Sequence, residues 1–455
     1  MTSLKKSQYQ FSKADLEELL YDYNQIPGVL PKDRPDKVSI WDETLRDGEQ
    51  TPGVFLNVEE KKSIALFLDE IGTAKIAVGF PAVSPSELEI VKTINQLDLH
   101  KATVLGIARP RLSDIDACLK ADLREIVIFM PISDLHLRIF KIDYAEQLEM
   151  IQDAYDYARD HGLSYNWVTE DGSRAKPDHL LKIGQLAIDN KAKSMILGDT
   201  VGILQPDSSA YLIELLKSKL NWVNSTTELG IHTHNDFGQA VANTCAAVFH
   251  GATIPHVCVN GYGERAGNAA FEEVVMNLEG MGIHTGIKLE KLTELSYLVE
   301  GIFTLPLSAH KPIVGSNAFA HESGLHINAL LAHPATYEPI NPAWVGQKRR
   351  IYLGKFSGSS AIINAFETKL KLSELNLPRQ VIQNIVQDIK NLQEESSKEE
   401  KIVLFNQTKQ LVEKLRAGIS DTEFFEIAKK HAGAYLKGTW AEGNLQGDPP
   451  DGPPS

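Results

Sequence analysis

Two short segments of the sequence carry side chains that could hold a metal ion. The first, WDETLRDGEQTPGV (41–54), includes Arg46, Asp47 and Gln50 among its crowded charged and amide groups. The second, GIHTHND (230–236), places His232 and His234 two residues apart, which in an extended segment puts both imidazoles on one face. Imidazole and carboxylate groups are ordinary ligands of divalent metals. The two segments predict a metal centre if the fold brings them to one point.

Short apolar or β-branched runs, separated by helical patterns, are the elements that would position these groups. The runs are KVSIW (37–41), AKIAV (74–78), TVLGIA (103–108), EIVIFM (125–130), SYNWV (164–168), SMILG (194–198), ELGIH (228–232) and HVCVN (256–260). Helix starts are indicated after Asn57 and Ser84, each with a glutamate three residues on. This alternation predicts an α/β fold, a (β/α)8 TIM barrel. A doubly wound open sheet is the alternative, but no GxGxxG motif follows the first run.

The barrel would bring the two segments together. In a closed ring of eight strands the seventh and eighth lie beside the first, and functional side chains gather at the carboxyl ends. Asp47, His232, His234 and Asn268 all lie at or behind such strand ends, Asn268 within NGYGERAGN (260–268). Two imidazoles, one carboxylate and one amide oxygen suit a divalent metal such as Mg2+, Mn2+ or Zn2+.

The remainder of the chain divides by composition. Residues 1–36 are expected to form an N-terminal extension, and residues 37–305 the TIM-barrel catalytic domain. Residues 306–365, rich in His, Pro, Gly and Asn, are expected to form a small linker or lid subdomain. Residues 366–440 are predicted to be a helical C-terminal region, and the Pro- and Gly-rich residues 441–455 a disordered tail.

The overall composition excludes several classes of protein. A chain of 455 residues with 43% hydrophobic content can bury a large core, and a formal net charge of −14 argues against nucleic acid or a membrane as partner. Three dispersed cysteines predict buried thiols instead of a disulfide framework or a zinc ribbon. No stretch reaches the length of about 20 apolar residues that a membrane span needs. These features predict a soluble, cytoplasmic protein.

Eight motifs in chain order carry a resemblance to a known family. They are LRDGEQTPGV, GFPAVSP, TEDGSR, GDTVG, HTHNDFGQAVAN, NGYGERAGNAAFEEV, HESGLH and YLGKFSG. Together they resemble the acetyl-CoA-dependent condensing branch of the DRE-TIM metallolyases, which contains the isopropylmalate, homocitrate and citramalate synthases. The resemblance implies a TIM barrel, a divalent metal, and a Claisen condensation of acetyl-CoA with a 2-oxo acid. The expected product is a 2-hydroxy dicarboxylic or tricarboxylic acid of the 2-isopropylmalate or homocitrate type.

The resemblance also implies roles for residues near the metal. It places Asp47, His232 and His234 on the ion, with Asn268 as an additional ligand. The ion would hold the oxo acid and polarise its carbonyl. Arg46 would lie over that carbonyl and stabilise the developing negative charge.

The same resemblance implies a set of substrate-binding residues. Thr200 in GDTVG would bind the substrate carboxylate, and Gln50 would orient the groups around the metal. His136 in SDLHLR is expected in the substrate pocket.

Acid–base catalysis is expected from Glu170 in TEDGSR and from two residues of the subdomain, His326 and Tyr337. Because His326 and Tyr337 lie outside the predicted barrel, we expect the subdomain to fold over the barrel mouth of a partner subunit, which implies a homodimer.

Two departures from the family pattern keep alternatives open. Ala77 stands where the family has glutamate, and Phe356 where it has histidine. A synthase forming citrate or citramalate, a lyase of the superfamily that cleaves a hydroxyacyl-CoA, and a catalytically silent paralogue are the alternatives. The helical character of residues 366–439 predicts an enzyme without leucine feedback.

Overall fold

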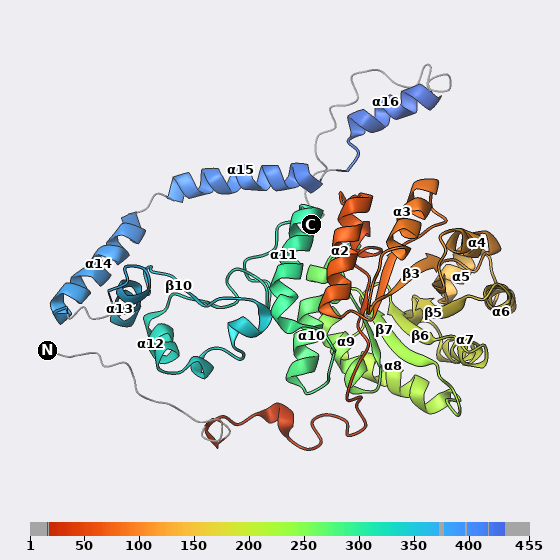
Figure 1. Ribbon diagram of the computed structural model, residues 1–455, viewed down its shortest axis with the longest axis horizontal. Coiled ribbons are helices and arrows are strands. Elements are labelled where there is room, and N and C mark those ends of the chain that lie inside the picture. Colours follow the sequence, from red (N-terminus) through yellow and green to blue (C-terminus); the bar gives the residue numbers. More distant parts are fainter. Residues whose placement is uncertain (1–15, 17, 373–376, 396–397, 417, 433–455) are drawn as a thin grey trace, which may run out of the picture.

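An eight-stranded parallel barrel forms the body of the computed structural model, which describes residues 16, 18–372, 377–395, 398–416 and 418–432 (Figure 1). The strands are β1 Trp41–Asp42, β2 Lys75–Gly79, β3 Thr103–Ala108, β4 Glu125–Pro131, β5 Ser164–Glu170, β6 Ser194–Asp199, β7 Glu228–Thr233 and β8 Ile254–Val257. They lie side by side in chain order, and β8 pairs with β1 to close the ring. The predicted TIM barrel is confirmed, whereas the predicted tail at 441–455 lies outside the described residues.

Helices alternate with the strands and cover the outside of the barrel (Figure 1). These helices are α2 Val58–Ile71, α3 Pro85–Asn95, α4 Leu112–Lys120, α5 Asp134–Phe140, α6 Tyr144–Asp160, α7 Pro177–Asp189, α8 Pro206–Lys219, α9 Ala240–Phe249, α10 Phe271–Gly280 and α11 Leu292–Phe303. Among the described helices, none is both long enough and apolar enough to cross a bilayer.

The two predicted helix starts are present. The Asn57 side chain accepts hydrogen bonds from the backbone N–H groups of Glu59 and Glu60, and the Glu60 carboxylate accepts one from the Asn57 N–H. Ser84 caps α3 by accepting from the Glu87 N–H, with Pro85 as the first helical residue. Such caps satisfy backbone donors that a helix leaves unpaired at its beginning. These caps define the first residues of α2 and α3.

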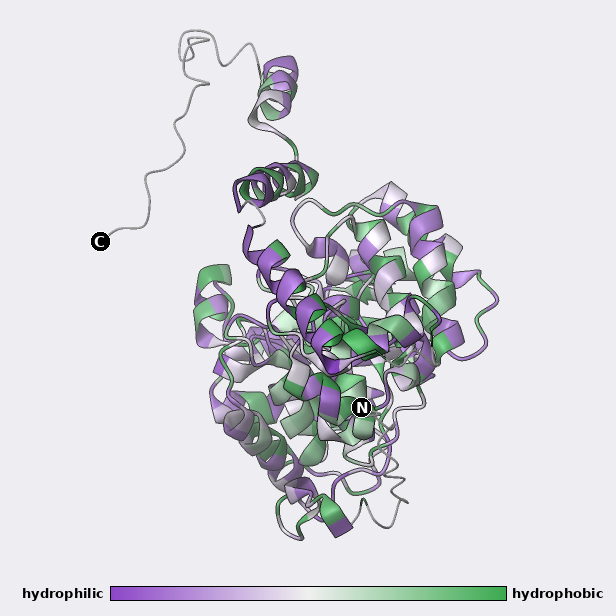
Figure 2. Cartoon of the chain, turned by 90° about the vertical axis from the view of Figure 1, so that its left-hand side faces the viewer, coloured by the Kyte–Doolittle hydropathy of each residue, from purple (hydrophilic) through white to green (hydrophobic). Residues whose placement is uncertain are grey.

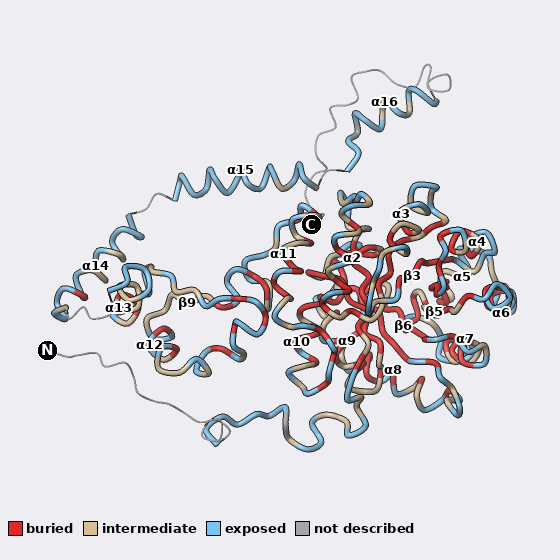
Figure 3. The backbone as a smooth tube through the Cα atoms, viewed as in Figure 1, coloured by how far each residue is buried: buried red, intermediate tan, exposed pale blue. Residues whose placement is uncertain are grey.

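The core has two layers of packed side chains. Figure 3 shows that the buried residues gather in the barrel. Inside the ring, apolar side chains from several strands pack on one another: Trp41, Leu105, Ile107, Val127, Ile196 and Ile254. Outside the ring, a larger cluster joins the strands to the helices. Filling the interior with side chains makes the barrel a packed scaffold and not a pore.

A network of polar groups, the basal network, closes the amino-terminal end of the barrel. Glu125 accepts hydrogen bonds from Lys75 Nζ at 2.6 Å, Lys193 Nζ at 2.8 Å and Asn166 Nδ2 at 2.9 Å. Ser194 Oγ donates to Asn166 Oδ1. Glu125 is paired with both lysines, and this pairing offsets part of the cost of burying its carboxylate.

Strands β1 and β8 differ from the predicted runs at 37–41 and 256–260. At the start of the predicted run the backbone pairs elsewhere, since Val38 N–H donates to His284 O, and only from Ser39 onward does the chain bond toward β8 and β2. After Val257 the chain leaves the ladder because the Cys258 backbone bonds to Ala269 and Phe271. Tertiary contacts to later loops therefore decide both boundaries.

Beyond α11 the chain forms a smaller region beside the barrel (Figure 1). It contains the two-stranded parallel sheet of β9 Ala320–His321 and β10 Arg350–Ile351, with α12 Gly324–Ala332 and α13 Ser359–Thr368. Three further helices, α14 Arg379–Glu395, α15 Lys398–Arg416 and α16 Asp421–Ala432, confirm the predicted helical C-terminal region. Hydrophobic and hydrophilic residues alternate along these helices (Figure 2).

Candidate metal centre and substrate cavity

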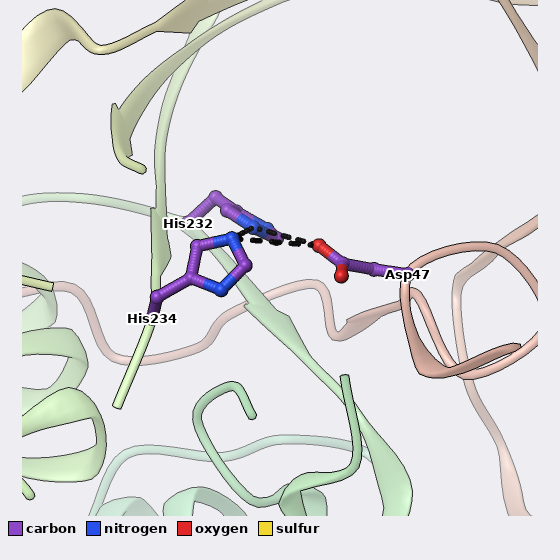
Figure 4. Close-up of side chains that lie close together, drawn as sticks. All are labelled: Asp47, His232 and His234. Carbon is purple, nitrogen blue, oxygen red and sulfur yellow. Dashed lines mark hydrogen bonds and ion pairs between the residues drawn. The ribbon is translucent and has the colours of Figure 1, made fainter. Parts of the chain in front are cut away.

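Three side chains at the carboxyl end of the barrel turn ligand atoms toward one another; we call them the metal cluster (Figure 4). Asp47 Oδ2 lies 3.2 Å from His232 Nε2 and 3.6 Å from His234 Nε2, and the two Nε2 atoms are 3.3 Å apart. All three residues are buried. The structure thus brings together, from β7 and the β1 loop, the residues that the sequence predicted as ligands.

Local structure explains how the cluster forms. His232 and His234 share the inner face of β7 and its extension, while Thr233 between them faces α9, where it bonds to the Ala240 carbonyl and Thr244. Asp47 precedes a short 3-10 turn, η2 Gly48–Gln50, that bends the chain back over the barrel mouth. The alternation of side chains along a strand therefore aims both imidazoles inward.

Asn268 adjoins the cluster. Its backbone forms a bridge with His234, and its Nδ2 donates to the Tyr262 carbonyl at 3.3 Å. A side-chain carbon at Gly263 would lie 2.0 Å from Asn268 Nδ2, so glycine is needed there. The buried Oδ1 of Asn268 has no hydrogen-bond partner among the described residues. A buried oxygen without a partner is costly, and a cation ligated beside Asp47 would satisfy it. The donor set therefore fits a divalent metal.

Burial and neighbouring charges set the protonation states of the candidate ligands. Burial raises the pKa of Asp47, but the Arg46 charge and the His232 hydrogen bond outweigh it and hold that pKa below its usual range. Burial, together with the neighbouring His232, lowers the pKa of His234 to about 4. An ionised carboxylate and a neutral imidazole are the forms that bind metal.

Arg46 is fixed beside the cluster. Its Nε donates to Glu43 Oε2 at 2.7 Å, and its Nη1 lies 3.3 Å from Asp47 Oδ2. Glu43 is itself buried, with His256 Nδ1 3.2 Å from its other oxygen. Burial lowers the pKa of Arg46, but Glu43 and Asp47 outweigh it and raise that pKa, so the guanidinium stays charged. Glu43 thus orients Arg46.

A cavity of about 330 Å³ opens in front of the cluster. Its polar side includes Arg46, Gln50, Thr200 and Glu170, all predicted from the sequence. Its other side is apolar and is called the apolar wall: Phe80, Ile107, Val127, Phe129 and Val168.

Asp171 links several of the predicted residues behind the cavity. Its Oδ2 lies 3.0 Å from His136 Nδ1, and its N–H donates to Thr200 Oγ1 at 2.7 Å. Arg174 Nε donates to its Oδ1 at 2.6 Å, and Ser133 Oγ donates to its Oδ2. Burial raises the pKa of Asp171, but Arg174 and Ser133 outweigh it, so the carboxyl is ionised. Asp171 therefore orients His136 and Thr200 together.

Two predicted catalytic residues lie apart from the cavity of their own chain. His326 in α12 and Tyr337 stack with ring centroids 4.1 Å apart, and both are exposed. Figure 1 shows α12 away from the barrel. The structure pairs these two residues but does not bring them to the metal cluster within one chain.

Several cavity residues were missed by the sequence analysis. Glu264 and Arg265 line the polar side of the cavity and lie within the motif NGYGERAGN, in which only Asn268 was predicted as a site residue. Asp171 lies within TEDGSR beside the predicted Glu170. The apolar wall gave no signal, because its members look like ordinary strand residues until the inner face of each strand is known.

Comparison with known proteins assigns the family. The model of the HMGL-like family matches residues 37–299, more than half of the chain. The chain belongs to the HMGL-like family. A second family model, described as homocitrate synthase post-HMGL domain-like, matches residues 313–397 of this HMGL-like protein.

Curated relatives place this HMGL-like protein among synthases. It is 45% identical over 340 residues to the 2-isopropylmalate synthase of Methanocaldococcus jannaschii, covering 74% of this chain and 64% of that protein. It is 40% identical over 368 residues to the homocitrate synthase of Methanopyrus kandleri, covering 80% and 90%. A third relative, from M. kandleri, has a name that proposes an (R)-citramalate synthase; it is 43% identical over 362 residues, covering 79% and 70%. These relatives confirm the predicted branch and the enzyme class.

Solved structures agree on the fold. The hydroxymethylglutaryl-CoA lyase of Bacillus subtilis matches with a TM-score of 0.54 and 23% identity, covering 61% of this chain and 97% of the lyase. At that identity the match supports the barrel and carries no argument about the reaction.

Proposed function

We propose that this HMGL-like protein condenses acetyl-CoA with a 2-oxo acid whose substituent is small and apolar. The observation that carries the proposal is the divided cavity, with the metal cluster and Arg46 on one side and the apolar wall on the other. A 2-oxo acid has the same division, because its keto and carboxylate oxygens lie at one end and its substituent at the other.

The apolar wall comes from β3 to β5 and from Phe80 just after β2, whereas β7 and the loop after β1 hold the metal cluster. A second carboxylate on the substrate would lose its hydration against this wall without gaining a partner. Arg109 stacks over Phe80 at 5.3 Å but is already paired with Asp114 through two hydrogen bonds. Arg265, on the polar side of the cavity, is likewise paired with Asp236 through two hydrogen bonds. This favours a product of the 2-isopropylmalate or citramalate type over the homocitrate type.

The metal cluster with Asn268 would hold a divalent cation, Mg2+, Mn2+ or Zn2+. When bound, the ion acts as a Lewis acid that polarises the keto group of the oxo acid. The relatives of this chain are synthases, and the cluster supplies a ligand set of the kind such an ion requires.

The groups around the cluster bind and orient the oxo acid. Arg46 offers a fixed positive charge to the keto oxygen as negative charge develops there, and a guanidinium held by Glu43 needs no reorientation during the reaction. Thr200 keeps its hydroxyl beside the cavity, where it binds the substrate carboxylate. Gln50 orients the groups around the cluster from the loop that also carries Asp47.

Glu170 is the proposed base at the end of β5. It removes a proton from the acetyl methyl group, and the carbon–carbon bond then forms to the keto carbon while the keto oxygen gains a proton and becomes a hydroxyl. Water then cleaves the thioester and releases CoA. Burial raises the pKa of Glu170, which makes it a stronger base than an exposed carboxylate.

The stacked pair His326 and Tyr337 is proposed to act at the mouth of a partner subunit, which makes the enzyme a homodimer. Support comes from their exposure and from their distance from the cavity of their own chain (Figure 1). His136, oriented by Asp171, is proposed to complete the substrate pocket.

Domain boundaries and location are likewise proposals. The end of α11 at Phe303 supports a barrel domain that closes near residue 305, followed by a lid subdomain at 306–365 and the helical region from 366. Three buried, unpaired cysteines support a cytoplasmic location, where thiols stay reduced.

The decisive experiment measures CoA release from acetyl-CoA in the presence of Mg2+ or Mn2+, with a chelator control. Pyruvate, 2-oxoisovalerate, 2-oxoglutarate and oxaloacetate are compared in parallel. We expect turnover with pyruvate or 2-oxoisovalerate and at least about tenfold lower kcat/KM with the two diacids. A preference for 2-oxoglutarate would contradict the role given to the apolar wall, and no release with any acid would contradict condensation.

A further inference from the structure

A fully buried lysine outside the cavity connects the two loops that shape it. Lys61 lies in α2, and its side chain has no exposed surface. Its neighbours on the inner face of α2 are apolar, including Ile64, Ala65 and Leu68. An ammonium group in that position is costly unless it is fully paired. Its partners therefore indicate why a charge is present.

Lys61 has three partners, and all belong to the carboxyl end of the barrel. Its Nζ lies 2.7 Å from Glu49 Oε2, 3.1 Å from Glu87 Oε1 and 3.1 Å from the Val78 carbonyl oxygen. Glu49 belongs to η2 in the β1 loop, whereas Val78 and Glu87 belong to the end of β2 and the helix that follows. One ammonium group thus joins two neighbouring loops of the barrel mouth.

Glu49 and Glu87 each hold the backbone of a loop that borders the cavity. Glu49 Oε1 accepts a hydrogen bond from the Leu56 N–H at 3.1 Å and so closes the loop that begins with Asp47 and Gln50. The Thr51 hydroxyl in the same loop accepts from the Gly263 N–H at 2.9 Å, which joins it to the loop bearing Asn268.

On the other side, Glu87 Oε1 accepts a hydrogen bond from the Phe80 N–H at 3.3 Å. A side-chain carbon at Gly79 would lie 1.9 Å from that oxygen, and the β2–β3 register shifts between Ala77 and Gly79. The carboxylate therefore occupies the space that only glycine leaves, and it holds the backbone that presents Phe80 to the apolar wall.

We propose that Lys61 is a positioning residue that sets the polar and apolar sides of the substrate cavity at a fixed distance. The ammonium group contacts no substrate; it acts through Glu49 on the loop of Asp47 and Gln50, and through Glu87 on Phe80. The inference rests on the proposed function for its kinetic consequence, but its structural consequence is measured without substrate.

The test compares Lys61→Met with Lys75→Met. Both replace a lysine paired to glutamate by an apolar side chain of similar length, but Lys75 is partly exposed and belongs to the basal network at the opposite end of the barrel. We expect both variants to unfold at lower temperature than the wild type. Only Lys61→Met should lower kcat and raise KM for the oxo acid, each by about tenfold, because the reacting groups are misplaced.

Amide hydrogen exchange of the intact protein gives a readout that is independent of turnover. In Lys61→Met we expect faster exchange in both segments 47–56 and 79–83, and in Lys75→Met in neither. Unchanged protection of the two segments would overturn the proposal. If the wild type itself released no CoA, the proposed function would fail, while this exchange measurement would still decide the role of Lys61.

The double variant Lys61→Met/Glu49→Gln separates positioning from stability. It removes the carboxylate that loses its main cation in Lys61→Met, so we expect the unfolding temperature to recover in part. The kinetic defect should remain, because the connection between the loops is still absent. Recovery of kcat and KM together with stability would show that an unpaired charge was the only defect.

Discussion

At the scale of single residues, the proposed chemistry depends on the metal cluster. His234→Ala removes one of the three converging ligand atoms, so we expect divalent-metal affinity and kcat/KM to fall at least about 100-fold. Calorimetric titration of the metal-free protein with Mn2+ measures the binding separately from activity. His250→Ala is a suitable control, because His250 caps the end of α9 and its partly exposed imidazole pairs with Glu214, which is not part of the metal cluster. Equal metal affinity in both variants would remove His234 from the ligand set.

Glu170 gives a prediction about pH at the same scale. Burial raises its pKa, and a base must be deprotonated to act, so activity should fall as pH falls through the raised value. The acid limb of kcat/KM should therefore lie above pH 4.5, the ordinary value for the group. Glu170→Gln should lower kcat by about 100-fold or more and abolish that limb. A pH–rate profile of the two proteins checks both expectations; an unchanged limb in the variant would assign it to another group.

At the scale of elements, the basal network ties together β2, β4, β5 and β6. Burial raises the pKa of Glu125, but Lys75, Asn166 and Lys193 outweigh it, so its folded-state pKa is below the unfolded value. Its stabilising contribution is then present above the unfolded pKa and is lost as pH falls through the folded one. Glu125→Gln should lower the free energy of unfolding by about 2 kcal/mol near neutral pH, since one lysine of the network is half exposed.

Denaturant titrations at pH 7 and in acid test this prediction. The wild type and Glu125→Gln should differ at pH 7 and converge as the pH falls. Glu228→Gln, an exposed residue at the start of β7 on the same end of the barrel, should remain within about 0.5 kcal/mol of the wild type. A difference between Glu125→Gln and the wild type that persists in acid would show that packing, not charge, accounts for it.

Element types were predictable from the sequence because buried parallel strands read as short apolar runs, and Asn57 and Ser84 mark helix starts by their chemistry. The exact ends of β1 and β8 were not predictable, since loops far along the chain compete for their backbone groups. The metal cluster followed from the adjacency of β7, β8 and β1 in a closed ring. The role of Lys61 could not be predicted from the sequence, because a lysine near a helix start resembles a solvent-exposed residue until its three partners are known.

At the scale of the whole molecule, the separation of His326 from the cavity makes dimerisation testable by complementation. His326→Ala and Asp47→Ala should each be inactive alone. If the stacked pair serves a partner subunit, hybrid dimers contain one intact composite site, and an equal mixture after subunit exchange should recover about a quarter of wild-type activity. No recovery, with exchange verified by differently tagged subunits, would show that each chain uses only its own groups.

The barrel closes on a strand that contributes only Trp41 and Asp42 to its ladders with β2 and β8. Asp47, in the loop directly after this strand, reaches past β8 to His232 of β7 and is also a proposed metal ligand. A cation shared between Asp47 and β7 would link the loop after β1 to the strand beyond β8. Bound metal should therefore slow local opening of the β1 pairings and slow cleavage by protease between residues 50 and 56. Loss of the ion would then loosen the mouth of the barrel as well as stop the proposed chemistry, and the metal-free protein should be cleaved faster than the metal-bound one.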